Sequence, residues 1–160
     1  MFAASADGRR ALTRDDVPHV FVLRRRGAPR RTAGFARAIS RTLAAAAPQV
    51  RGDVTLVLAG DEAVRRLNKR YRGKDRATDV LSFGLGDGRE PGEPFGDIVV
   101  SVDAARRQAR EYDATLEREI ERLVVHGTLH LCGYDHHERR EAARMHGLTR
   151  RVLRELHADG

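Results

Sequence analysis

Two histidines four residues apart, His126 and His130, are the side chains of this sequence best placed to do chemistry. In a helix, residues four apart stand on one face about one turn from each other, so both imidazoles can bind one ion. Gly133 follows, and a glycine in the left-handed conformation just past the last turn reverses the chain. This reversal can bring up His136, so the spacing predicts a metal site with three neutral imidazoles: His126, His130 and His136.

Three protein ligands leave one position of a tetrahedral ion open, which is typical of catalytic zinc rather than of structural zinc. We therefore predict one Zn²⁺ ion, although other transition metals also accept imidazole ligands. Cys132 lies two positions after His130, on roughly the opposite side of the helix, and is not predicted to be a ligand. The alternative is that the three histidines lie separately on the surface and bind no ion.

The three histidines and the glycine also match the spacing of the metzincin protease signature, HExxHxxGxxH. The glutamate of that signature is the general base that activates the metal-bound water. Gly127 stands at its position in this sequence, and glycine cannot transfer a proton. A metallopeptidase is therefore the least favoured of the enzymes considered.

Residues 126–136, HGTLHLCGYDH, resemble the signature HGxLHLxGYDH of the YbeY family at every fixed position. Members of that family are metal-dependent endoribonucleases of ribosomal RNA maturation. Three other segments resemble the family in the same order, and together they extend the resemblance over roughly residues 50–156: LNKRYRGKD (67–75), ATDVLSF (77–83) and GDIVVS (96–101). The resemblance implies a small mixed sheet of about four strands packed on helices, a central metal helix and a cleft along the sheet edge.

A cationic segment around Gly73 is the second candidate for chemistry. A loop there would hold several cations in solvent or over a phosphate. The family resemblance places Arg72 in the active cleft, and a guanidinium fork suits phosphate geometry, so Arg72 is the predicted catalytic residue. The neighbouring cations are predicted to bind RNA: Lys69, Arg70 and Lys74.

The nucleophile is left open by the sequence. A metal-bound water would need a base, and Gly127 cannot serve as one. The available groups are Asp97, Asp135 and a phosphate of the substrate. Alternatively, the 2′-hydroxyl of the RNA attacks the neighbouring phosphorus, with the metal as Lewis acid.

Hydrophobic periodicity predicts strands and helices that alternate at first and end in consecutive helices, which indicates an α+β domain. We expect about four strands, about five helices and one domain over residues 18–157, after a flexible extension over residues 1–17. Asp61 is the expected N-cap of the second helix, and a mobile loop is expected over residues 84–96. The expected strands are 19–23, 53–59, 79–83 and 97–101, and the expected helices are 32–47, 61–71, 104–112, the metal helix from about 116 and 138–156.

Composition favours a polyanionic partner, because 30 basic and 23 acidic residues give a net charge of +7. With the resemblance, this indicates RNA, in particular ribosomal RNA and ribosomal particles. The single cysteine allows no internal disulfide, and no run of residues is long and apolar enough for a membrane span, so we expect a cytoplasmic protein. The alternative function is a non-catalytic assembly factor that binds ribosomal RNA and uses the metal only structurally. The oligomeric state is not indicated.

Overall fold

The computed structural model describes residues 17–158, so the predicted extension, apart from Val17, lies outside the described residues. Within this range the chain forms one domain with four strands and five helices, as predicted. In chain order the elements are β1 (Val20–Arg24), α1 (Ala33–Ala46), β2 (Asp53–Ala59), α2 (Asp61–Arg72), β3 (Val80–Gly84), β4 (Pro94–Ser101), α3 (Val102–Glu111), α4 (Leu116–Leu131) and α5 (Arg139–Ala158).

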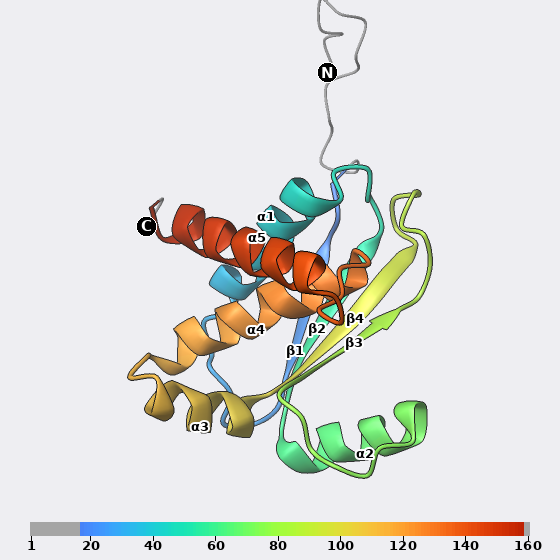
Figure 1. Cartoon of the computed structure of the whole chain (residues 1–160). Helices are drawn as coiled ribbons and strands as arrows, with labels where there is room; N and C mark the ends of the chain where they lie inside the picture. The colour runs from blue at the N-terminus through green and yellow to red at the C-terminus, as the bar shows by residue number, and fades with distance from the viewer. Residues whose placement is uncertain (1–16, 159–160) are drawn as a thin grey trace, which may run out of the picture.

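The sheet is mixed and has the strand order β1-β2-β4-β3 (Figure 1). β1, β2 and β4 are parallel, whereas β3 is antiparallel to β4 and forms one edge. Alternation along β4 sends successive side chains to opposite faces of the sheet. Ile98 and Val100 therefore belong to the main core, while Val99 belongs to a smaller cluster on the other face.

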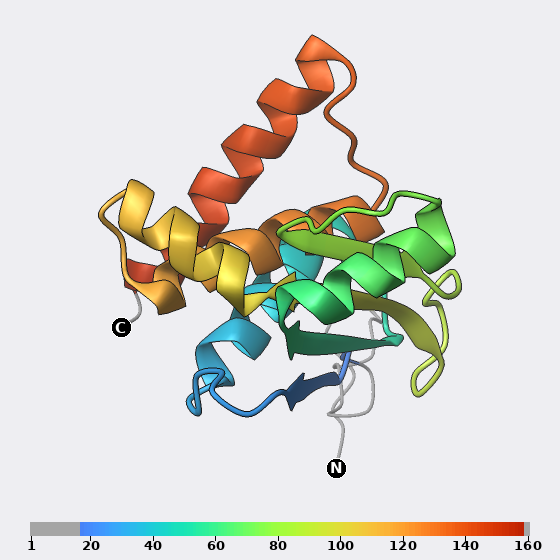
Figure 2. The same cartoon turned by 90° about the horizontal axis from the view of Figure 1, so that it is seen from below.

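Helices cover the two faces of the sheet unequally. α1, α3, α4 and α5 contribute to the main core, and α4 lies between the sheet and α5 (Figure 1). α2 packs alone on the opposite face, as the view from below shows, where Val64 meets Leu81 and Val99 (Figure 2). None of the helices in residues 17–158 is long and apolar enough to cross a membrane.

The starts of two elements lie two or more residues before the predicted positions, because a cap and strand pairing extend them. β4 begins three residues before Asp97, because Gly96 pairs with Gly84 of β3 and with Val54 of β2. α3 begins at Val102 rather than Ala104, because the hydroxyl of Ser101 accepts a hydrogen bond from the Ala104 N–H (3.1 Å) and caps the helix. Only residues 85–93 of the predicted loop lie outside strands.

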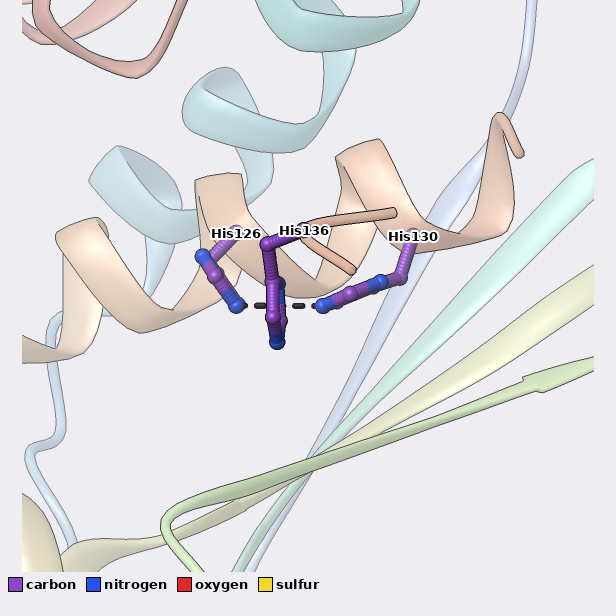
Figure 3. A group of neighbouring side chains, drawn as sticks. All are labelled: His126, His130 and His136. Atoms are coloured by element: carbon purple, nitrogen blue, oxygen red, sulfur yellow. Dashed lines mark hydrogen bonds between the residues drawn. The ribbon is translucent and has the colours of Figure 1, made fainter. Parts of the chain in front are cut away.

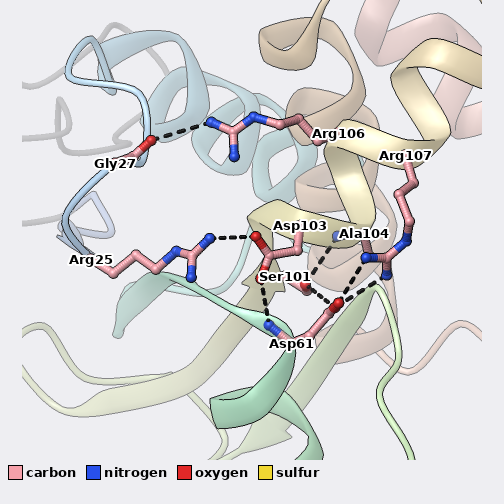
Figure 4. Close-up of polar contacts among 8 residues, drawn as sticks. All are labelled: Arg25, Gly27, Asp61, Ser101, Asp103, Ala104, Arg106 and Arg107. Carbon is pink, nitrogen blue, oxygen red and sulfur yellow. Dashed lines mark hydrogen bonds and ion pairs between the residues drawn. The ribbon is translucent and has the colours of Figure 1, made fainter.

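The prediction that Asp61 caps α2 is wrong. Gly60 is the N-cap residue, and Asp61 is the first residue of the helix. Its carboxylate instead accepts hydrogen bonds from Arg107 (2.7 and 3.2 Å) and Ser101 (2.7 Å), as Figure 4 shows. The backbone N–H of Asp61 donates to Asp103 Oδ2 (2.9 Å), and Asp103 also forms an ion pair with Arg25. A carboxylate from α3 thus caps α2 and joins the two helices at the edge of the sheet where β2 and β4 end.

These contacts lower the pKa of both carboxyl groups. The hydrogen bond from Arg107 is the main cause for Asp61, and the N–H of Asp61 is the main cause for Asp103. A carboxyl group with a lowered folded-state pKa adds stability above its unfolded pKa, and this contribution is lost as the pH falls through the folded value.

We expect Asp61→Ala to lower the free energy of unfolding by roughly 1 kcal/mol at pH 7, a modest value because the pair is partly exposed. The difference from wild type should shrink as the pH falls below about 4, because the Asp61 carboxyl is then protonated in the unfolded chain and, at still lower pH, in the folded protein as well. Urea unfolding from pH 3 to 7 measures both effects. Glu62→Ala, in the same helical turn, is the control, and an equal loss in both variants at every pH would contradict the role of Asp61.

Candidate metal centre

α4 lies unusually close to the sheet at Gly127. A Cβ atom at this position would come within 2.9 Å of Ile98 Cγ2 and 3.1 Å of both Ser82 Oγ and Val80 Cγ2. The Ser82 hydroxyl also donates a hydrogen bond to the Gly127 carbonyl (2.8 Å), which ties β3 to α4. The absence of a side chain at 127 therefore sets the distance between the helix and the sheet, and with it the depth of the neighbouring His126.

α4 begins and ends at defined caps. Thr115 accepts a hydrogen bond from the Arg118 N–H (3.2 Å) at the start. At the other end Gly133 has a φ of +92°, as predicted for a left-handed residue. The Gly133 N–H donates to His130 O and the Tyr134 N–H donates to Leu129 O, both at 3.0 Å. This pair of bonds is a Schellman motif, which satisfies the last carbonyls and turns the chain back along the helix.

The turn brings the three histidines together, as Figure 3 shows. One ligand nitrogen from each of His126, His130 and His136 lies within 4.8 Å of the other two. The Nε2 atoms of His126 and His130 are 3.1 Å apart. Two nitrogens bound to one tetrahedral zinc at about 2.0–2.1 Å would lie roughly 3.3 Å apart, so this pair is already close to the spacing of metal ligands.

The surroundings favour the neutral form of the His126 and His130 imidazoles. Burial, followed by the nearby His130 and His136, lowers the pKa of His126 to about 4. Burial, followed by His136, also lowers the pKa of His130. A metal ligand must carry an unprotonated nitrogen, so the donor set fits a transition metal, and its identity is not fixed by these ligands.

Cys132 does not belong to this group, as predicted. It packs against the main core, and burial raises the pKa of its thiol to about 11. A thiol in this state is protonated at neutral pH and is a poor metal ligand. Met145 lies in α5 and is buried, so no separate methionine turn within residues 17–158 underlies the histidines.

The histidines open into a cavity of about 1040 Å³ between the edge strand β3, the end of α4 and α5. Arg72 and Lys74 line this cavity. Arg72 donates a hydrogen bond to the Ser82 carbonyl (2.8 Å), and its guanidinium lies 5.7 Å from the ring centroid of Phe83. Ser82 thus contacts both the metal helix, through its hydroxyl, and Arg72, through its carbonyl.

The other cations predicted to bind RNA lie outside the cavity lining. Lys69 is 4.0 Å from Asp75, and Arg70 lies over the ring of Tyr71. Of the two acidic candidates for the base, Asp135 lines the cavity, whereas Asp97 does not. Ile98 faces α4, so alternation along β4 sends Asp97 to the opposite face of the sheet, where burial raises its pKa.

Arg122 and Ser82 are two of the cavity residues that were not predicted from the sequence. Arg122 lies one turn before His126 on α4, and its position four residues ahead of the first histidine was an available signal. Ser82 was noted only as part of a strand motif. Its contact with the Gly127 carbonyl joins positions 45 residues apart, for which the sequence of this one chain carries no local signal.

Fold and site together define a class, that of small α+β proteins with a three-histidine group at the end of a buried helix. Residues 28–157 match the family model described as Endoribonuclease YbeY, and the chain belongs to the YbeY family.

Relatives in two bacteria carry the same description. The Myxococcus xanthus protein is 50% identical over 106 residues, which cover 64% of this chain and 36% of that protein. The Heliobacterium modesticaldum protein is 45% identical over 113 residues, which cover 64% of this chain and 68% of that protein. The chain therefore matches only about a third of the length of the first relative.

A solved structure supports the fold. The solution structure of TM1509 from Thermotoga maritima matches with a TM-score of 0.62 and 27% identity, over 88% of this chain and 90% of that one.

We expect Gly127→Ala to lower the free energy of unfolding by roughly 1–3 kcal/mol, because the new methyl group would overlap the buried Ile98. Gly147→Ala is the matched control. Gly147 lies inside α5 with open space around it, so alanine there should be neutral or stabilise the helix by up to about 1 kcal/mol. Urea unfolding measures both, and a Gly127→Ala protein as stable as wild type would refute the close-packing argument.

Proposed function

We propose that this chain is a metal-dependent endoribonuclease that cleaves single-stranded RNA during ribosomal RNA maturation in the cytoplasm. The observation that carries the proposal is the convergence of three histidine nitrogens within 4.8 Å, in a cavity that Arg72 and Lys74 also line. The description Endoribonuclease YbeY, which the family and both relatives share, supports an RNA substrate. The net charge of +7 supports a polyanionic partner.

His126, His130 and His136 would hold one transition-metal ion, which we propose to be Zn²⁺. Such an ion supplies a Lewis acid for a phosphoryl oxygen and lowers the pKa of bound water. The three imidazoles provide neutral donors, so the ion keeps its full charge toward the substrate. Asp135 lines the cavity and is the acidic candidate for accepting the proton of an attacking water, whereas Asp97 lies on the wrong face of the sheet.

Arg72 is the proposed catalytic cation. Its contact with the Ser82 carbonyl uses one donor of Nη2, and its guanidinium lies over the ring of Phe83. The remaining N–H donors can bind the non-bridging oxygens of a phosphodiester, where negative charge increases in the transition state. Lys74 lines the same cavity and is proposed to bind a neighbouring phosphate as a point charge. Lys69 and Arg70, outside the lining, are proposed to contact RNA beyond the cleaved bond.

The metal assignment is tested by elemental analysis of protein purified without added metal, together with cleavage of a single-stranded RNA. We expect about one equivalent of a transition metal in the wild type and loss of both metal and cleavage in His126→Ala, His130→Ala and His136→Ala. His157→Ala is the control, because His157 lies 3.1 Å from Glu121 and outside the ligand group. His137→Ala and His146→Ala should also retain the metal.

The same proteins, assayed with RNA and with casein, distinguish the proposed endoribonuclease from the two alternative functions. Wild-type protein that binds RNA without cleaving it, whether or not the metal ligands are intact, would favour the non-catalytic assembly factor. Cleavage of casein but not of RNA would favour the peptidase, for which Gly127 offers no base.

For Arg72→Lys we expect kcat/KM for RNA to fall by about tenfold to a hundredfold, because a lysine keeps the charge but loses the planar fork. Metal content and unfolding midpoint should stay at wild-type values. Arg66→Lys, at an exposed position of the same helix outside the cavity lining, should cleave at the wild-type rate. A cleavage rate in Arg72→Lys equal to that of Arg66→Lys would withdraw the catalytic assignment.

A further inference from the structure

Glu119 and Arg122 form a buried charge pair on the metal helix. Glu119 is 3% exposed, so its carboxylate is almost fully removed from water. Arg122 donates three hydrogen bonds to it: from Nε to Oε1 (3.2 Å) and Oε2 (3.3 Å), and from Nη2 to Oε1 (2.6 Å). The contact with Glu119 is also the main reason why the pKa of Arg122 is raised.

The Arg122 guanidinium reaches the metal cavity from this pair. Its side chain is 40% exposed, and Arg122 lines the same cavity as Arg72 and the three histidines. It stands four residues before His126, on the same face of α4 and about one turn away. The side of Arg122 that is not held by Glu119 is therefore open to whatever occupies the cavity.

The donors left free by Glu119 have a defined geometry. A guanidinium carries five N–H donors, and Glu119 takes the edge formed by Nε and one hydrogen of Nη2. The second edge, formed by Nη1 and the other hydrogen of Nη2, has the spacing of two oxygens of a phosphate. A buried carboxylate that holds one edge orients the opposite edge and reduces the entropy lost when it binds.

The nearby Asp79 accepts its hydrogen bonds from groups other than this edge of Arg122. Asp79 also lines the cavity, but its Oδ1 accepts from the Val80 N–H (2.8 Å) and its Oδ2 accepts from the Gln108 amide (3.1 Å). Asp79 thus fixes the start of β3.

From this geometry we infer that Arg122 is a second phosphate-binding residue of the cavity, positioned by Glu119, and that it binds a phosphate of the RNA strand beside the one held by Arg72. The inference rests on the proposed function, because it assumes a phosphodiester strand in the cavity. Arg122 would add a substrate contact to α4 itself, so the helix that carries His126 and His130 would also bind the RNA. The competing explanation is that Arg122 only neutralises the buried Glu119.

A charge-neutral double variant separates these explanations. Glu119→Gln/Arg122→Gln removes one negative and one positive charge, so the net charge stays constant while the guanidinium fork is lost. Its control is Arg151→Gln/Glu155→Gln on α5, which removes an ion pair (3.1 Å) outside the cavity lining. Urea unfolding of both variants confirms that each is folded before binding is measured.

The first readout is equilibrium binding of a fluorescent single-stranded RNA, with chelator present so that the RNA stays intact. We expect the Glu119→Gln/Arg122→Gln protein to bind about tenfold more weakly than wild type, the loss typical of a charged hydrogen-bonding group. The slope of log affinity against log salt should also decrease by about 0.7, the value for one phosphate contact of a single strand. The α5 control should match wild type in both.

The second readout is cleavage with metal present, where kcat/KM should also fall in Glu119→Gln/Arg122→Gln. Wild-type affinity and salt dependence in this variant, with wild-type protein cleaving RNA, would overturn the inference and leave the proposed function intact. Wild-type protein that neither binds nor cleaves RNA would overturn both. Arg122→Lys adds a check: it keeps the pair with Glu119 but has no second edge, so it should fold normally and bind RNA more weakly.

Discussion

The close approach of α4 to the sheet at Gly127 is the constraint on which the rest of the site depends. Because no side chain intervenes, Ile98 and Val80 pack directly against the helix backbone, and Ser82 reaches the Gly127 carbonyl. This contact buries the helix, and burial holds the pKa of His126 far below its ordinary value. It also brings β3 within reach of Arg72 through the Ser82 carbonyl. One glycine therefore links the packing of α4, the protonation of His126 and the position of Arg72.

Much of this arrangement could be predicted from the sequence because the determining signals are local. Apolar residues at helical spacing defined α4, and the four-residue step placed His126 and His130 on one face. Gly133 predicted the reversal before His136, and the structure confirms its left-handed conformation with φ at +92°. Strand positions were also found to within a few residues, since alternation along β2 and β4 reflects burial on the two faces of one sheet.

The parts that could not be predicted depend on contacts between distant segments. Asp61 had the residue type and position of a cap, but Arg107 and Ser101 compete successfully for its carboxylate, and Asp103 caps the helix instead. Lys69, Arg70, Arg72 and Lys74 are equivalent as a charge run, and the family resemblance singled out Arg72 alone. Only the packing of α2 beneath the sheet decides that Arg72 and Lys74 line the cavity while the other two remain outside. A run of cations in the sequence does not distinguish its members, and the tertiary structure decides which of them line the cavity.

The glycine at position 127 also determines what kind of catalysis α4 can support. A glutamate there, as in the metzincin signature, would have to place its side chain where Ile98 and Ser82 already lie. A helix packed this closely cannot present a base from that position. Chemistry in the cavity would then rely on other side chains, and its lining carries four cations, Arg72, Lys74, Arg122 and Arg150, against two carboxylates, Asp79 and Asp135. Such a set stabilises negative charge better than it transfers protons, which matches the demands of a phosphodiester more closely than those of a peptide.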